Sequence, residues 1–88
     1  MGTNGKAMSE RIRQVIMEHA RLPSAVDALE DDADLYQAGM TSHASVNLML
    51  GLEGAFDVEF PDSMLKRSVF QSIASIAAAL EELEAAVA

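Results

Sequence analysis

The sequence predicts a small all-α protein, a four-helix bundle of three principal helices and one short helix, with a long first loop. Alanine is abundant, while aromatic residues are limited to three phenylalanines and one tyrosine. Apolar residues recur at the helical spacing of three and four residues in three separate segments. The chain has 88 residues, which is enough for one domain. We therefore expect a single small core built from helices.

Composition excludes several classes of function. Six basic residues against fourteen acidic ones give a net charge of −8, which disfavours nucleic acids and anionic membranes as partners. The absence of cysteine excludes disulfides, thiolate chemistry and a Cys-ligated zinc site. No apolar run approaches the roughly 20 residues of a membrane span, and we find no signal peptide. We therefore expect a cytoplasmic protein that has neither a membrane partner nor a bound metal.

The N-terminal part is expected to comprise a flexible leader, residues 1–8, followed by the domain, residues 9–88. Ser9 is positioned to cap the first helix, and Pro23 marks where that helix ends. The predicted inward face of this helix has the spacing i, i+3, i+4, i+7. It consists of Ile12, Val15, Ile16 and His19.

The segment 21–41 lacks a sustained period and is expected to be a long ordered loop. A loop of about 20 residues in a small domain is normally either functional or disordered. Leu35 is the residue that we expect to anchor it in the core. Gly39 is expected to take a positive φ and turn the chain into the next helix. The acidic residues of this loop are expected to be solvated, because they lack the glycine and the closing glutamate of a calcium loop.

The second helix is expected to begin at Ser42, with Thr41 as its N-cap, and to end near Ala55. On a helical projection, one arc is apolar and is predicted to face the core. It contains Val46, Leu48, Met49, Leu50, Leu52 and Phe56. The opposite arc contains His43, Ala44, Asn47, Gly51, Gly54 and Ala55.

A short helical turn is expected over residues 62–67, capped by Asp62, with Met64 and Leu65 facing inward. The last helix is expected to begin between Ser68 and Ser72, where Ser68 and Gln71 fit a capping box. Its apolar stripe consists of Ile73, Ile76, Ala77, Leu80, Leu83 and Val87.

Ser42 is the residue with the clearest chemical potential. A serine in the first turn of a helix lies beside free N–H groups and the positive end of the helix dipole, which together favour a phosphate ester. Serine is also common there simply as a cap or filler, so this position alone does not decide its role.

The order and spacing of several segments nevertheless resemble the acyl carrier protein family. The resemblance covers residues 11–83 and includes the pattern Asp-x-Leu-x-x-x-Gly-x-x-Ser over 34–42. It also includes the apolar spacing after the serine and Phe-Pro-Asp over 60–62. The resemblance implies an acyl-carrier-like bundle that is not an enzyme. It implies a 4′-phosphopantetheine arm, attached to Ser42, whose thiol holds a cargo as a thioester.

The resemblance also implies partner enzymes. They are a phosphopantetheinyl transferase, a cargo-loading ligase and a downstream acceptor. Thr41 stands where the family usually has aspartate, His43 stands where it has leucine, and the outer arc of the second helix is neutral. These departures resemble a subgroup of free-standing carriers that are loaded with small amino acids by ligases similar to aminoacyl-tRNA synthetases. Like most of the family, the chain is expected to be a monomer.

The neutral outer arc is the surface expected to contact partners. Either a partner approaches its two glycines closely, or the glycines are tolerated neutral variation or pack against another segment of the chain. His43 is expected to contact the arm or a partner, because adjacent helix residues point about 100° apart and suit a nucleophile–base pair poorly. His19 is expected at the edge of the core. The predicted partner surface consists of Met40, Thr41, His43, Asn47, Leu50, Gly51 and Gly54.

Three other functions remain open at this point. The first is an acyl carrier for chains of fatty-acid or polyketide type. The second, from another class, is an unmodified acidic interaction module that binds a basic partner. The third, a hydrolase built on Ser42 and His43, is disfavoured by the geometry and by the small size of the domain.

Overall fold

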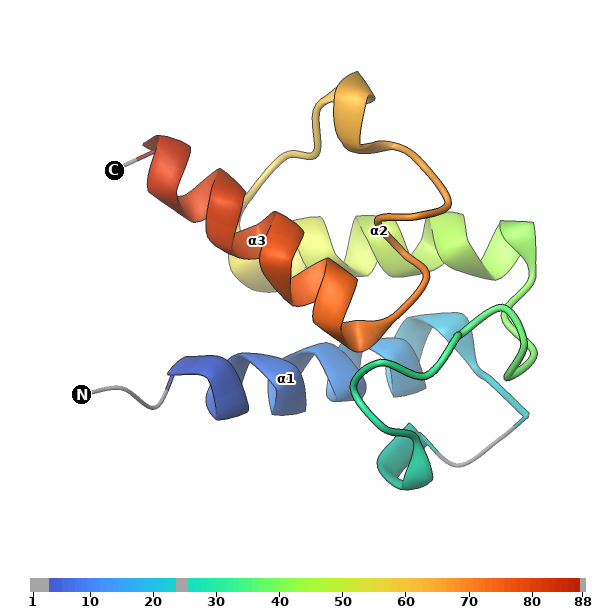
Figure 1. Cartoon of the computed structure of the whole chain (residues 1–88). Helices are drawn as coiled ribbons and strands as arrows, with labels where there is room; N and C mark the ends of the chain where they lie inside the picture. Colours follow the sequence, from blue (N-terminus) through green and yellow to red (C-terminus); the bar gives the residue numbers. More distant parts are fainter. Residues whose placement is uncertain (1–3, 24–25, 88) are drawn as a thin grey trace.

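The computed structural model describes residues 4–23 and 26–87, and this part of the chain is helical without any β-strand. The principal helices are α1 (Asn4–Val15), α2 (Ser42–Phe56) and α3 (Ile73–Val87). In Figure 1, α1 and α2 run side by side in opposite directions, and α3 crosses them obliquely. The predicted all-α bundle with three principal helices is confirmed.

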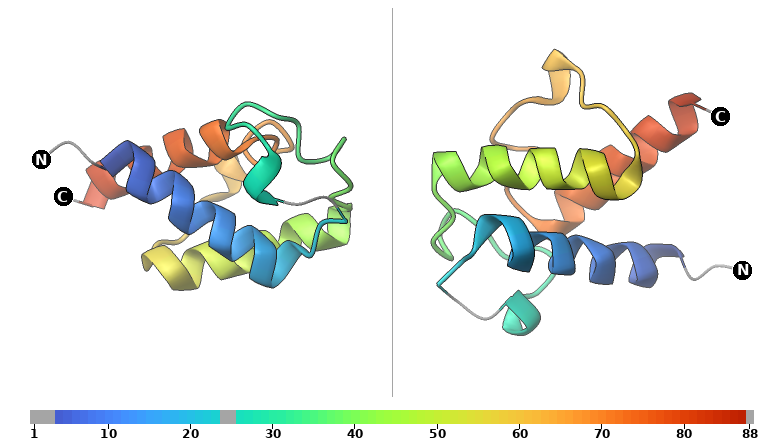
Figure 2. Two further views of the ribbon diagram at one scale, coloured as in Figure 1. Left: turned by 90° about the horizontal axis from the view of Figure 1, so that it is seen from below. Right: turned by 180° about the vertical axis from the view of Figure 1, so that it is seen from behind.

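Three short elements complete the described fold. The π-helical turn η1 (Ile16–Ala20) continues α1, and the 3₁₀ turn η2 (Val26–Ala28) lies in the long first loop. A second 3₁₀ turn, η3 (Asp62–Met64), lies between α2 and α3. As Figure 2 shows, α1 begins and α3 ends at the same end of the bundle, while α2 begins at the opposite end.

The first helix begins earlier than predicted. It starts at Asn4 instead of near Ser9, so it extends into the expected leader, of which residues 1–3 lie outside the described ranges. Met8 packs against the core one turn before Ile12, which gives the longer helix an apolar contact. The Ser9 hydroxyl lies within the helix and donates to Asp31 Oδ1 at 3.4 Å, so Ser9 is not the cap. The division into leader and domain stays a prediction.

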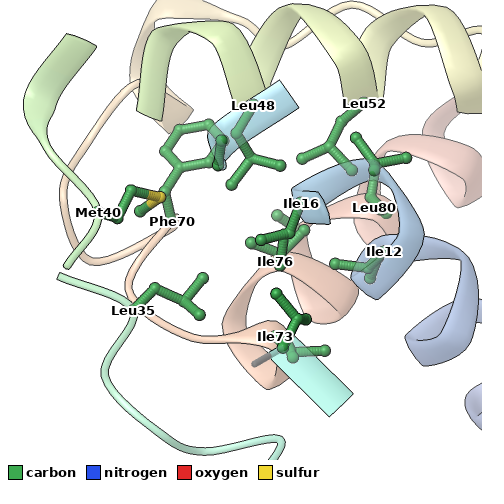
Figure 3. Close-up of a cluster of buried hydrophobic side chains, with 14 of the residues drawn as sticks. Ile12, Ile16, Leu35, Met40, Leu48, Leu52, Phe70, Ile73, Ile76 and Leu80 are labelled. Atoms are coloured by element: carbon green, nitrogen blue, oxygen red, sulfur yellow. The ribbon is translucent and has the colours of Figure 1, made fainter. Parts of the chain in front are cut away.

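The core fills the space between the three principal helices and the first loop (Figure 3). Eight large side chains are fully enclosed, and they come from every one of these segments. They are Ile12, Ile16, Leu35, Leu48, Leu52, Ile73, Ile76 and Leu80. His19 differs from the prediction because it is exposed, whereas its three stripe partners are buried.

The long first loop is held by contacts with α1 and with the start of α3. Leu35 is completely buried, as predicted, and its N–H donates to the Gln71 carbonyl at 2.7 Å. The Asp31 carbonyl in turn accepts from the Ala74 N–H at 2.8 Å. Arg13 binds the other side of the loop, donating to the Val26 carbonyl and the Asp31 carboxylate at 2.6 and 2.7 Å. The loop thus satisfies backbone groups at the start of α3 while its own groups are satisfied in return.

The segment between α2 and α3 differs in detail from the prediction. Pro61 precedes η3, and no side chain caps this turn, so Asp62 is not its cap. Leu65 is 45% exposed instead of facing inward, whereas Met64 packs against the core. A reciprocal pair caps the start of α3: the Ser72 hydroxyl accepts from the Ser75 N–H, and the Ser75 hydroxyl accepts from the Ser72 N–H, each at 3.0 Å.

Two leucines of α2 provide a matched test of the core. Leu52→Ala removes a fully buried side chain and is expected to lower the free energy of unfolding by about 2–5 kcal/mol. Leu50→Ala makes the same change on the same helix at a side chain that is 56% exposed, so a change within about 0.5 kcal/mol is expected. Urea denaturation of both variants measures the difference, and equal losses of stability would contradict this orientation of α2.

Candidate functional site

Ser42 is the exposed first residue of α2. Thr41, in an extended conformation, caps the helix: its Oγ1 accepts from the Ala44 N–H at 3.0 Å, and its carbonyl accepts from the Ser45 N–H at 2.9 Å. The predicted cap is therefore confirmed. The N–H groups of Ser42 and His43 belong to the first turn, where the helix itself supplies no acceptor. The helix end thus presents an accessible hydroxyl beside two backbone donors.

The chain immediately before Ser42 is held in two ways. Gly39 has φ +116°, and a Cβ at this position would lie 2.5 Å from Pro23 Cγ, so both conformation and space require glycine. Met40 is only 3% exposed, and its N–H donates to the Leu35 carbonyl at 3.0 Å. The expectation that Met40 belongs to an exposed partner surface is therefore wrong. Its side chain instead anchors the residues that precede the cap.

An open groove of about 300 Å³ adjoins Ser42. It lies between the first half of α2 and the segment 65–70, which passes over that helix in Figure 1. Its wall is mainly apolar, and Ser42 is itself part of it. The lining residues are Tyr36, Ser42, Ser45, Val46, Met49, Leu65, Lys66, Arg67 and Phe70.

Two cations line this groove, although the chain as a whole is acidic. Both Lys66 and Arg67 are exposed, and the Arg67 guanidinium lies over the Tyr36 ring, 4.0 Å from its centroid. The one ion pair in the described part of the chain joins Arg13 and Asp31, so neither groove cation has a carboxylate within 4.0 Å there. Neither residue is among the site residues predicted from the sequence, although two of the six basic residues of the chain are adjacent here.

The outer face of α2 is apolar and uncharged. Val46 and Leu50 are 51% and 56% exposed, although the helical projection places both on the apolar arc. For Val46 this corrects the prediction, whereas for Leu50 it agrees with the predicted partner surface. Ala44 and Ala55, predicted on the outer arc, pack against the core instead. The helix is therefore rotated relative to the predicted arc. Its exposed stripe, called the outer face below, consists of His43, Val46, Leu50 and Gly54.

The two helical glycines have different surroundings. A Cβ on Gly51 would lie 2.5 Å from Cδ2 of the His19 ring, so this glycine packs against η1. Nothing lies within 4 Å of the equivalent position on Gly54. Asn47, which precedes Gly51 by one turn, is half-buried. Of the predicted partner surface, Thr41, His43, Leu50 and Gly54 are thus the exposed residues.

Carboxylates of the first loop and of α2 make specific contacts instead of being merely solvated. Asp34 Oδ1 accepts from the N–H groups of Tyr36 and Gln37 at 2.9 and 3.2 Å, which stabilises the turn before Gly39. Glu53 accepts from the Phe60 N–H at 2.9 Å and so holds the segment after α2. Within residues 4–23 and 26–87, no three His, Asp or Glu side chains are grouped so that they could hold a metal ion. Nor does any described helix have the length and apolar character to cross a membrane.

The chain belongs to the phosphopantetheine attachment site family, whose pattern it matches over residues 10–80. Proteins of this class carry a covalently attached 4′-phosphopantetheine. The chain is 52% identical over 69 residues to the aminoacyl carrier protein of Agrobacterium fabrum, an alignment that covers 78% of this chain and 83% of that protein.

Two solved structures extend the comparison. One is a crystal structure of an engineered glycine:[carrier protein] ligase from Bradyrhizobium japonicum in complex with a carrier protein from Agrobacterium tumefaciens and AMP. The matched chain has a TM-score of 0.81 and 49% identity, covering 84% of this chain and 99% of that one. The other is a solution structure of a protein from Agrobacterium tumefaciens, with a TM-score of 0.75, 45% identity and coverage of 91% and 96%.

The site fits a phosphopantetheine group in three respects. Ser42 offers an exposed hydroxyl for a phosphodiester, and the backbone donors beside it suit a phosphate. Lys66 and Arg67 add positive charge to the same groove. The apolar wall formed by Val46, Met49 and Leu65 can contact the pantetheine portion.

The glycines of α2 provide a test of its packing. Gly54→Ala is expected to stabilise the protein by up to about 1 kcal/mol, because glycine is a poor helix former and nothing obstructs the added methyl. Gly51→Ala is expected to gain less, because the methyl must displace the His19 ring. Thermal unfolding measures both. When His19 is also replaced by alanine, Gly51→Ala should stabilise the protein as much as Gly54→Ala does, because the ring no longer obstructs the methyl. Equal stabilisation by the two single substitutions would contradict the proposed contact.

Proposed function

We propose that this protein carries a small amino acid as a thioester on a 4′-phosphopantetheine arm attached to Ser42, and presents it to partner enzymes without itself catalysing a reaction. The observation that carries the proposal is the position of Ser42. It is an exposed serine at a capped helix start that opens into a mainly apolar groove. Membership of the phosphopantetheine attachment site family supports Ser42 as the point of attachment.

The proposed modification uses coenzyme A and a phosphopantetheinyl transferase. The Ser42 hydroxyl loses its proton to a base of the transferase, a bond forms from Oγ to the phosphorus of the pantetheine phosphate, and the diphosphate bond to adenosine 3′,5′-bisphosphate breaks. Thr41 caps the first turn, and the backbone donors of that turn would hold the phosphate. The arm supplies a thiol, which a chain without cysteine otherwise lacks.

Ser42 and His43 form no hydrogen bond with each other in the described part of the chain, and both are exposed to solvent. A nucleophile needs a base within hydrogen-bond reach and a site sheltered from water. This arrangement supports a modified carrier serine over a hydrolase.

The outer face of α2 is the surface that we propose for partners. Val46 and Leu50 are exposed apolar side chains of this face, which contains no Asp, Glu, Lys or Arg. Gly54 has no side chain, so the backbone there is accessible. A loading ligase that recognises this face would need apolar complementarity instead of a basic patch. We expect the carrier to function in the cytoplasm and as a monomer.

Two serines in the groove provide the test of attachment. Incubation with coenzyme A, magnesium and a broad-specificity transferase is expected to add the mass of phosphopantetheine to the wild type and to Ser45→Ala, but not to Ser42→Ala. Ser45 is the matched control because it lines the same groove one turn later and donates to the Ser42 carbonyl at 2.7 Å. Intact mass spectrometry decides the result. If folded wild-type protein gains no mass with several transferases, an unmodified interaction module becomes the better reading.

The modified protein then allows the cargo to be tested. The relatives support glycine or a similarly small amino acid. A glycine:[carrier protein] ligase with ATP is therefore expected to load glycine, and Leu50→Ala is expected to lower kcat/KM for loading severalfold without loss of stability.

An acyl chain is the second candidate cargo, because the groove beside Ser42 is mainly apolar. Loading by an acyl ligase, together with rejection of glycine by every aminoacyl ligase tried, would favour that candidate.

A further inference from the structure

The groove beside Ser42 combines an apolar wall with two unpaired positive charges. Lys66 and Arg67 belong to a chain of net charge −8, yet neither forms an ion pair with a carboxylate in the described residues. The Tyr36 ring, on which the Arg67 guanidinium lies, is also part of the groove lining. Whatever enters this groove therefore meets two cations that no carboxylate within 4.0 Å neutralises in the described residues.

The arm changes its charge when it is loaded. Its phosphodiester, fixed at Ser42, is negative whether the arm is loaded or not. Its free end is a neutral thiol before loading, but carries an ammonium group once an amino acid is attached through its carboxyl group. A neutral end can lie along Val46, Met49 and Leu65, whereas an ammonium is repelled by the two groove cations and loses hydration on contact with the apolar wall.

We propose that Lys66 and Arg67 make docking of the arm in this groove depend on the charge of its free end. The unloaded arm docks in the groove, and the aminoacylated arm is displaced into solvent. This proposal rests on the attachment at Ser42 proposed above. Its consequence is that loading itself exposes the cargo to the acceptor enzyme, while the unloaded thiol stays sheltered.

A pair of cargoes of nearly equal size isolates the charge. The carrier is prepared with an unloaded arm and with arms bearing glycyl or propionyl groups through stable amide linkages, transferred to Ser42 from the corresponding coenzyme A analogues. At about pH 6.5 the glycyl amine is protonated, whereas the propionyl group is neutral. Backbone amide shifts of the groove residues Val46, Met49, Leu65 and Phe70 in nuclear magnetic resonance spectra, referred to the unmodified protein, report docking.

The unloaded and propionyl forms are expected to shift these amides, and the glycyl form is expected to shift them less. A difference of roughly two- to fivefold in the docked population is the size expected for exposed charges. In 1 M salt, where the screening length falls to about 3 Å, the part of the difference that comes from repulsion by the cations should be lost, so the difference should shrink. Equal shifts for the glycyl and propionyl forms in low salt would overturn the proposal, as would an absence of groove shifts in all three forms.

Charge variants complete the test. Lys66→Gln/Arg67→Gln is expected to reduce the difference between the glycyl and propionyl forms to the part that comes from the hydration of the ammonium. Arg21→Gln removes the same kind of charge at an exposed position outside the groove and should preserve the full difference. A difference as large in the double variant as in the wild type would overturn the assignment to these residues. Mass spectrometry of each sample separates the two proposals, because failure of Ser42 modification would be seen before any arm is compared.

Discussion

The arrangement of the site depends on one exchange of backbone hydrogen bonds, between the long first loop and the start of α3. The Leu35 N–H donates to the Gln71 carbonyl, and the Ala74 N–H donates to the Asp31 carbonyl. Each segment supplies the partner that the other lacks, because neither the loop nor the first turn of a helix can satisfy its own groups. Burial of the Leu35 side chain adds an apolar anchor at the same point. The end of the loop, and with it the cap and Ser42, is thereby fixed relative to α3.

Several carboxylates of this strongly acidic chain are bound elsewhere in the fold. The Asp31 carboxylate forms an ion pair with Arg13. The Asp34 carboxylate accepts hydrogen bonds from the turn that follows it and from the Gln71 side-chain amide, and the Glu53 carboxylate accepts from the Phe60 N–H. These carboxylates are bound within the fold, and none of the three residues lines the groove. Lys66 and Arg67 have no carboxylate within 4.0 Å in the described part of the chain. Net charge describes the solubility of this protein, but it does not describe the potential at its site.

Features that depend on a few neighbouring residues could be predicted from the sequence. The Thr41 cap, the turn at Gly39 and the anchoring role of Leu35 all follow from local chemistry, and the family pattern predicted the carrier class. The rotation of α2 could not be predicted in this way. This helix is apolar almost all round, so periodicity does not say that Leu48 and Leu52 face the core while Val46 and Leu50 face solvent. Contacts with η1, through Gly51 and His19, belong to the tertiary structure that decides the rotation.

An α2 that is apolar on both sides is consistent with two separate roles for its apolar residues. Leu48 and Leu52 stabilise the fold, whereas Val46 is half exposed on the outer face and also lines the groove. A partner that covers Val46 must therefore approach the edge of the groove in which the arm is proposed to dock. Partner contact and arm docking then compete for the same side chain, and either the partner or the charge of the cargo can release the arm. Val46, which lies one turn after Ser42 in α2, thus belongs both to the proposed partner surface and to the groove in which the arm is proposed to dock.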